Sequence, residues 1–314
     1  MFKSMALNSV LVEVGRLENA TKKQNDLKML HKKGCLIFGM LNSNYMKKLV
    51  ILLCLIDASL FGSSQFLYTG VIAKYDFFGN SNDSSGNNLH ASNQGAVMSQ
   101  DRFQNGNSAY SFNGQNNYLV VDDNALLKPN VFSVSLWIKA DQWNNIPNSS
   151  PYVDIFTKDK NSVTPNERQY VIQAVSSGVI KSTVQTTGQE NSGYTVNGGP
   201  SGDGSLSLGE WHQIVSVWDS KSMNIYLNGE NAYTFDFLNQ SQDLNTGASP
   251  LRIGGSPEWD QYFKGSIDDV RIFDYALSSS DVSSLYATES VPEPSALSLL
   301  AVGLGGLAMF RRRS

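Results

Sequence analysis

The chain contains few of the residue types that most often carry chemistry. Its 314 residues include 2 cysteines and 3 histidines. Both cysteines, Cys35 and Cys54, precede residue 65, so residues 65–290 can form no disulfide, and their stability must come from a packed core or a bound metal. In the same range only His90 and His212 remain as histidines. Cysteine chemistry is therefore excluded there, and histidine chemistry is restricted to two positions.

Basic residues are also scarce between residues 65 and 290. This range holds 8 Lys and 4 Arg against 23 Asp and Glu, a net charge of −11, whereas the whole chain carries −4 because its two ends are basic. An acidic balance of this size argues against a nucleic acid as partner. It is compatible with cation binding and with solubility outside a cell.

Long apolar runs are absent except near the two ends. The stretch 291–314, "VPEPSALSLLAVGLGGLAMFRRRS", contains an uncharged run, Ala296–Phe310, which is shorter than the ~20 residues that cross a bilayer comfortably. Before it stand Pro292, Glu293 and Pro294. After it stand Arg311, Arg312 and Arg313, positive charge of the kind that stays on the cytoplasmic side. An ordinary buried helix is the alternative, but it would gain nothing from three terminal arginines.

These three parts, in this order, closely resemble the PEP-CTERM sorting signal. The resemblance covers residues 291–314 and implies recognition and processing by an exosortase. It further implies an exported protein of the cell envelope or extracellular space, held transiently in the inner membrane by its C-terminal helix. A sorting signal determines where a protein is sent, so it does not reveal what the preceding domain does.

A second apolar run has the layout of a secretory signal peptide. Met46-Lys47-Lys48 supplies a charged start, Leu49–Ile56 an apolar core, and Gly62-Ser63-Ser64 a small-residue site. We expect residues 46–64 to be removed by cleavage after Ser64, with Ala73 as a second candidate. Residues 1–45 then form an upstream extension, with Met46 as the true start. The alternative is a cytoplasmic basic segment that binds nucleic acid.

Between the two ends, hydrophobicity alternates with a period of two. In "VFSVSLWIKA", one face of the predicted strand carries Phe132, Val134, Leu136 and Ile138, and the other carries Ser133, Ser135, Trp137 and Lys139. "MNIYLNGE" alternates in the same way and ends in Asn228-Gly229, a strong hairpin signal. "WHQIVSVWD" is apolar on both faces. One helical turn is predicted in "LSSSDVSSLY", where Ser278 precedes Asp281 by three residues. The pattern predicts an all-β, two-sheet antiparallel sandwich.

The order of these segments resembles the laminin-G-like, concanavalin A-like jelly rolls. "AYSFNGQNNYLVV", "FSVSLWIKA", "GEWHQIVSVWD", "MNIYLNGE" and "GSIDDVRIFDYALS" follow one another in the family's order. The resemblance implies a jelly-roll domain at residues 72–287, followed by the sorting signal at 288–314 with its short hydrophobic helix.

This superfamily includes binding modules as well as polysaccharide-degrading enzymes, so fold alone does not decide function. The Glu-x-Asp-x-x-Glu run of its laminarinase-type members is absent, and so is the Gln-Ile-His strand of its alginate lyases. His212, in "GEWHQIV", is expected to pack rather than catalyse. We therefore expect no enzyme, but a non-catalytic module that binds a polysaccharide or a protein; the alternative is a glycoside hydrolase or lyase.

The resemblance also implies a structural calcium ion at the last strand. Asp268 is the matching carboxylate, with Asp76 and the backbone of Gly114 as possible neighbours, and calcium prefers such oxygen ligands. The alternative is that these carboxylates, with Asp83 and the pair Asp122-Asp123, only close turns and strands.

Sugar binding would need exposed aromatic rings beside amide or carboxylate partners. Trp143 in "DQWNNIPN", and Trp259 with Tyr262 in "PEWDQYF", stand in polar sequence and are the candidate glycan platforms. Nothing in the sequence identifies the sugar.

Overall fold

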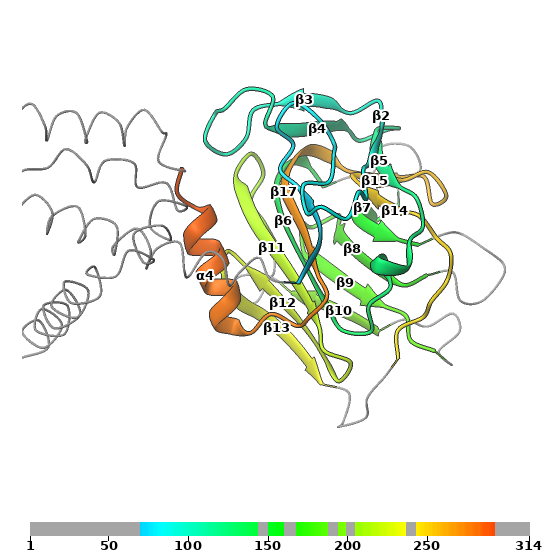
Figure 1. Ribbon diagram of the computed structural model, residues 1–314. Helices are drawn as coiled ribbons and strands as arrows, with labels where there is room; N and C mark the ends of the chain where they lie inside the picture. The colour runs from blue at the N-terminus through cyan, green and yellow to red at the C-terminus, as the bar shows by residue number, and fades with distance from the viewer. Residues whose placement is uncertain are drawn as a thin grey trace, which may run out of the picture. The chain divides into compact units, whose positions relative to one another are not determined.

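The computed structural model describes residues 70–143, 150–159, 168–187, 194–198, 205–236 and 243–292, which all belong to one unit of the chain, residues 70–314. In these residues the chain forms two antiparallel sheets packed as a sandwich, with one α-helix beside them (Figure 1). The predicted all-β sandwich is confirmed. The upstream extension 1–45, the signal peptide 46–64 and the apolar run 296–310 lie outside the described residues.

The larger sheet has eight strands. Its order is β13-β12-β11-β6-β17-β4-β3, and β1 also pairs with β17. The strands are β1 (Val71–Tyr75), β3 (Val97–Ser99), β4 (Ala109–Asn113), β6 (Phe132–Gln142), β11 (Trp211–Trp218), β12 (Ser222–Leu227), β13 (Glu230–Asp236) and β17 (Lys264–Phe273). The last strand therefore lies inside the sheet and joins early and late parts of the domain.

The smaller sheet has seven strands in the order β10-β9-β8-β7-β14-β5-β2. They are β2 (Ser92–Gln94), β5 (Tyr118–Val121), β7 (Tyr152–Lys158), β8 (Tyr170–Val175), β9 (Ile180–Val184), β10 (Tyr194–Gly198) and β14 (Leu251–Ile253). A two-stranded ribbon, β15 (Gly255–Ser256) with β16 (Gln261–Tyr262), follows β14, and a 3-10 turn, η1 (Ala125–Leu127), follows β5.

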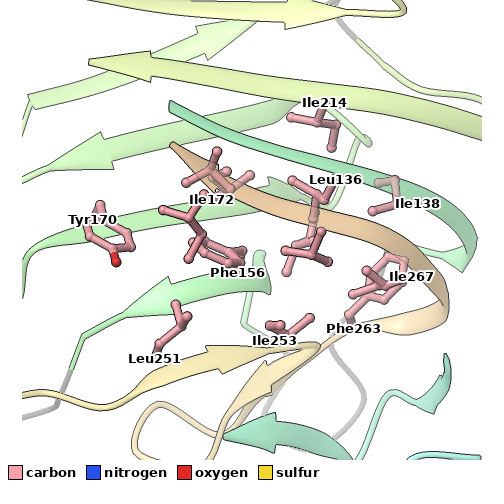
Figure 2. Packing of buried hydrophobic residues seen from close by; sticks show 14 of the residues in the cluster. Leu136, Ile138, Phe156, Tyr170, Ile172, Ile214, Leu251, Ile253, Phe263 and Ile267 are labelled. Carbon is pink, nitrogen blue, oxygen red and sulfur yellow. The ribbon is translucent and has the colours of Figure 1, made fainter. Parts of the chain in front are cut away.

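The hydrophobic core lies between the two sheets. Figure 2 shows Leu136 and Ile138 of β6 and Ile267 of β17 in one cluster with Phe156 of β7 and Ile172 of β8. The alternation predicted in "VFSVSLWIKA" is confirmed, because all four of its named apolar residues belong to this core. Since burial of each such side chain contributes about 1.5–3 kcal/mol, the core needs no disulfide to hold the sheets together.

The helix, α4 (Ser279–Glu289), packs against the opposite face of the larger sheet. It begins at a capping box, in which the Ser278 hydroxyl accepts from the Asp281 N–H and the Asp281 carboxylate accepts from the Ser278 N–H, as predicted. Val215 and Val217 of β11 pack with Leu285 of the helix in a second apolar cluster. The helix therefore explains why β11 is apolar on both faces.

The predicted hairpin is also confirmed. β12 and β13 are joined at Asn228-Gly229, whose φ angles are 51° and 81°. Positive φ at both central residues is typical of the turn that matches the twist of a two-residue hairpin.

Candidate functional site

One face of the seven-stranded sheet points away from the core and carries polar side chains. Asp154 of β7 pairs in register with Gln173 of β8, which in turn pairs with Lys181 of β9. Each of them has a core residue next to it in the strand, namely Ile155, Ile172 and Ile180. Because side chains alternate along a strand, a carboxyl, an amide and an ammonium group form a row across three strands on the outer face.

Hydrogen bonds join this row to the β15–β16 ribbon. The side-chain amide of Gln173 donates to Asp154 Oδ1 at 2.5 Å and to Gln261 Oε1 at 3.2 Å. The Lys181 ammonium lies 4.4 Å from the centre of the Tyr152 ring, which is cation–π distance. The row is thus held by the sheet on one side and by β16 on the other.

Asp159, which follows β7 directly, joins several further groups. Its Oδ2 accepts from Trp259 Nε1 at 3.0 Å and from Arg168 Nε at 2.9 Å. Its backbone carbonyl accepts from Arg252 Nη1 at 3.0 Å. Arg168 also lies over the Trp259 ring, at 5.5 Å from its centre. Asp159 therefore orders one aromatic and two cationic side chains.

Arg252 forms an ion pair with Glu258 and extends outward, since Leu251 and Ile253 on either side of it are core residues. We call these residues together the polar face: Asp154, Asp159, Arg168, Gln173, Lys181, Arg252, Glu258, Trp259 and Gln261. A surface of alternating donors and acceptors beside an aromatic ring suits a ligand with many hydroxyl groups.

The charges of the polar face are perturbed by burial. Burial, with a smaller effect from the Asp159 carboxylate, raises the pKa of Asp154 to about 7, although Gln173, Arg168 and Lys181 oppose the rise. Burial and the nearby Arg168 lower the pKa of Lys181. A carboxyl group that changes its charge near neutral pH is typical of functional sites.

The three residues proposed as glycan platforms are not gathered together. Trp259 belongs to the polar face, but Trp143 is 7% exposed and Tyr262 is 6% exposed. The indole of Trp143 packs over Gly178, where an added Cβ would lie 2.6 Å from Nε1, and Nε1 donates to the Leu206 carbonyl at 3.2 Å. The expectation that Trp143 and Tyr262 are exposed platforms was wrong: polar neighbours in sequence did not place these rings at the surface.

The proposed calcium neighbours are not gathered at one point. Gly114 lies at the start of β17, since a Cβ on it would be 2.8 Å from the Lys264 Cβ. Asp268 comes four residues later in the strand, about 13 Å away at ~3.3 Å per residue. Asp76 pairs with Lys74 at 2.8 Å. Gly114 therefore has no part in any site that contains Asp268.

The cation beside Asp268 is the guanidinium group of Arg102. Nη1 of Arg102 contacts Asp268 Oδ2 at 2.8 Å and Nη2 contacts Asp269 Oδ2 at 2.7 Å. The other oxygen of Asp268 accepts from the Asp269 N–H at 2.8 Å. Burial and the Asp269 charge raise the pKa of Asp268, and Arg102 opposes that rise. As placed, these residues do not fit a calcium ion, and no group of three or more His, Cys, Asp or Glu in the described ranges is arranged to hold a metal.

His212 contacts Ser207, a pair that could suggest a serine nucleophile. The direction of the hydrogen bonds argues against it. Asn228 accepts from the Gln213 N–H through Oδ1, so its amide nitrogen faces His212 Nδ1, at 3.2 Å. Nδ1 is then the acceptor and Nε2 carries the proton, which points to Ser207 Oγ at 2.9 Å; Oγ in turn donates to Glu210 at 2.6 Å. A base for Ser207 needs an unprotonated Nε2, so in this tautomer His212 orients Ser207 and does not activate it.

Of the sorting signal, Pro292 is exposed and is the last described residue; Glu293, Pro294, Arg311, Arg312 and Arg313 lie outside the described residues. In the described ranges no helix is long and apolar enough to span a membrane.

The row of Asp154, Gln173 and Lys181 was missed in the sequence. One signal was present: Asp154 interrupts the apolar run "YVDIF", where an ionisable group has no structural reason to be. Gln173 and Lys181 gave no such signal, because polar residues alternate in any strand with one solvated face.

Comparison with known proteins supports the architecture. A family model described as "Concanavalin A-like lectin/glucanases superfamily" matches residues 113–283, more than half of the chain, and one described as "PEP-CTERM protein-sorting motif" matches residues 290–313. A search of curated proteins finds no match.

Several solved structures are similar in fold. The binding domain of Paraclostridial Mosquitocidal Protein 1 has a TM-score of 0.57 and 16% identity, over 71% of this chain and 53% of that chain. Domain 4 of AbnA, an extracellular arabinanase of Geobacillus stearothermophilus solved with arabinotriose, has a TM-score of 0.52 and 22% identity, over 69% and 98%. The botulinum neurotoxin DC binding domain, solved with SialylT, has a TM-score of 0.52 and 18% identity, over 71% and 52%.

This chain thus spans about half the length of the two toxin chains, and identities this low establish the fold alone. The sorting motif indicates an exported, exosortase-sorted protein of the cell envelope. The chain belongs to the concanavalin A-like lectin/glucanase superfamily and carries a PEP-CTERM sorting motif.

Proposed function

We propose that this protein is an envelope or matrix protein whose sandwich domain is a non-catalytic glycan-binding module, and that the polar face is its binding surface. The observation that carries the proposal is the row of Asp154, Gln173 and Lys181, aligned by strand register on the side of a rigid sheet that faces away from the core; Asp154 is 1% exposed and holds the partly exposed Gln173 in place. Side chains ordered by a sheet lose little entropy when they bind hydroxyl groups. Two structures of similar fold were solved in complex with arabinotriose and with SialylT.

The sorting motif supports a location outside the cytoplasm for this function. In the proposed sequence of events, residues 46–64 direct export and are removed, the apolar run near the C-terminal end holds the chain transiently in the inner membrane, and an exosortase then processes the tail. The acidic domain is left outside the cytoplasm, where polysaccharide ligands are found.

A polysaccharide-degrading enzyme is the second candidate, and one observation favours it. A carboxyl group with a pKa of about 7, that of Asp154, suits a general acid near neutral pH. A glycoside hydrolase normally needs a second carboxylate across the sugar. Asp159, the carboxylate of the polar face whose charge acts on Asp154, already has one oxygen bound to Trp259 and Arg168, which favours binding over turnover.

A single experiment tests the proposal against the enzyme. The purified full chain is incubated with a panel of polysaccharides, and both retention on the immobilised polymers and release of reducing ends or unsaturated products are measured. We expect retention without turnover, and loss of retention in Gln173→Leu but not in Lys221→Gln, which alters an exposed residue outside the polar face. Turnover that is abolished in Asp154→Asn would establish the enzyme instead. Absence of both signals would leave a purely structural role.

A further inference from the structure

Two aromatic rings on the polar side of the smaller sheet are covered by cations. The Lys181 ammonium lies 4.4 Å from the centre of the Tyr152 ring, and the Arg168 guanidinium lies 5.5 Å from the centre of the Trp259 ring. A sugar that stacks on an aromatic ring needs an open ring face. On these two rings one face is already occupied by a positive charge, so stacking of a neutral sugar is disfavoured there.

Both cations have hydrogen-bond donors that contact no acceptor among the described residues. Among the described residues, Lys181 has no carboxylate within the 4.0 Å of an ion pair, and Arg168 contacts Asp159 through Nε alone, which leaves both terminal nitrogens of the guanidinium group without a protein acceptor. By contrast, the buried Lys158 is paired with Asp123 at 2.6 Å. The polar face therefore offers two sets of donors that carry positive charge and have no acceptor in the part of the chain that the structure describes.

The two cations also lie near enough to act on each other. The charge of Arg168 is among the causes that lower the pKa of Lys181, and both charges act on Asp154. Like charges on one surface repel, and anionic groups bound to them relieve that repulsion while they accept charge-assisted hydrogen bonds. A guanidinium group with two free nitrogens matches the two oxygens of a carboxylate or sulfate.

We infer that the polar face binds an acidic saccharide, whose uronate carboxylates or sulfate groups are held by Lys181 and by Arg168. The inference rests on the proposed function and specifies its ligand class. The net charge of −11 between residues 65 and 290 does not prevent this, because charges more than about 8 Å apart are largely screened at physiological ionic strength.

Asp154 makes this binding dependent on pH. The groups that face it are Gln173, Asp159, Arg168 and Lys181. Below its raised pKa of about 7 the Asp154 carboxyl is neutral, and the surface then carries one negative charge fewer. Above that pH the ionised carboxylate competes with the ligand for the two cations, so affinity for an acidic polymer should fall as the pH rises through about 7.

The test uses two pairs of polymers that differ only in charge. Polygalacturonate is compared with its methyl ester, and dextran sulfate with dextran, by calorimetry on the full chain. We expect the acidic member of at least one pair to bind about tenfold more tightly than its neutral partner, and the pair that responds distinguishes uronate from sulfate. Lys181→Gln and Arg168→Gln should each weaken that binding by about tenfold, whereas Lys221→Gln, on an exposed lysine outside this face, should leave it unchanged.

Each other result has a distinct meaning. Equal binding of charged and neutral polymers overturns the acidic-ligand inference and leaves the proposed glycan function standing. Binding to no polymer in the panel overturns both. Selective binding that survives both substitutions, in variants that melt at the wild-type temperature, shows that acidic ligands bind elsewhere and removes this site.

Discussion

Replacement of Arg102 by methionine should strongly destabilise the domain. The guanidinium group of Arg102 bonds to Asp268 at 2.8 Å and to Asp269 at 2.7 Å, and its Nε donates to the Glu289 carbonyl at 2.8 Å. It also lies 4.6 Å from the centre of the Trp137 ring. This one side chain therefore joins the last strand of the sandwich to the end of helix α4.

The expected loss follows from what the substitution leaves behind. Asp268 is 3% exposed, so without Arg102 its carboxylate is buried with only a backbone N–H as partner. Removal of one member of a buried ion pair typically costs about 3–5 kcal/mol. Methionine keeps the apolar stem over Trp137, so the loss reports charge rather than packing. At ~2–4 °C per kcal/mol for a domain of about 220 residues, Tm should fall by roughly 6–20 °C.

Thermal unfolding of the full chain, followed by circular dichroism, measures this change. Arg102→Met, Asp268→Asn and the double variant form a mutant cycle, and the double variant should lose less stability than the sum of the two single changes, because it buries no unpaired charge. If the cycle is additive, or if Arg102→Met loses less than about 1 kcal/mol, the pair does not hold the strand and helix together.

Two further conditions sharpen the result. Loss of Arg102 removes the charge that opposes the rise in the pKa of Asp268, so this pKa rises further. At about pH 5 the buried carboxyl of the variant is then protonated and neutral, whereas at about pH 8 more of it is charged. The stability lost in Arg102→Met should therefore be smaller at about pH 5 than at about pH 8. Since Arg102 occupies the cation position, wild-type Tm should be the same with millimolar calcium and with a chelator. An increase of several degrees with calcium in wild type, but not in Asp268→Asn, would contradict the reasoning, since saturating metal adds about 2.7 kcal/mol at a hundred times Kd.

Three other outcomes are expected. Folding raises the pKa of Asp154 from 3.8 to about 7, so wild type loses stability as the pH rises between those values. The Tm of Asp154→Asn relative to that of wild type should therefore increase across that range and then level off. A Tm difference that does not change with pH would show that the carboxyl is solvated. Trp143→Ala should lower the free energy of unfolding, measured with urea, by about 3–5 kcal/mol, as for a large core side chain. An unchanged urea midpoint would show that the Trp143 ring is exposed. N-terminal sequencing of protein recovered from the cell envelope should begin at residue 65, and a start before Met46 would refute cleavage at Ser64.

Local features of the sandwich were readable because they depend on neighbouring residues. The period of two in β6 follows from the alternation of side chains in any strand with one buried face. The turn at Asn228-Gly229 and the cap at Ser278 depend on residues two or three positions apart, so their chemistry is visible in a short window of sequence. Exposure of the tryptophans was not readable, because loop sequence around Trp143 is polar whether its ring points outward or into the core.

The sequence by itself therefore determined the all-β class, the strand and hairpin positions, and the sorting motif, all of which are set by short-range patterns. Which side chains from distant parts of the sequence contact each other was decided only by the tertiary structure. Arg102 and Asp268 are 166 positions apart, and nothing local indicates that a guanidinium group stands where a metal was expected. The row of Asp154, Gln173 and Lys181 exists only because strand register aligns three separate segments, and a shift of one residue would turn each of these side chains to the other face of the sheet.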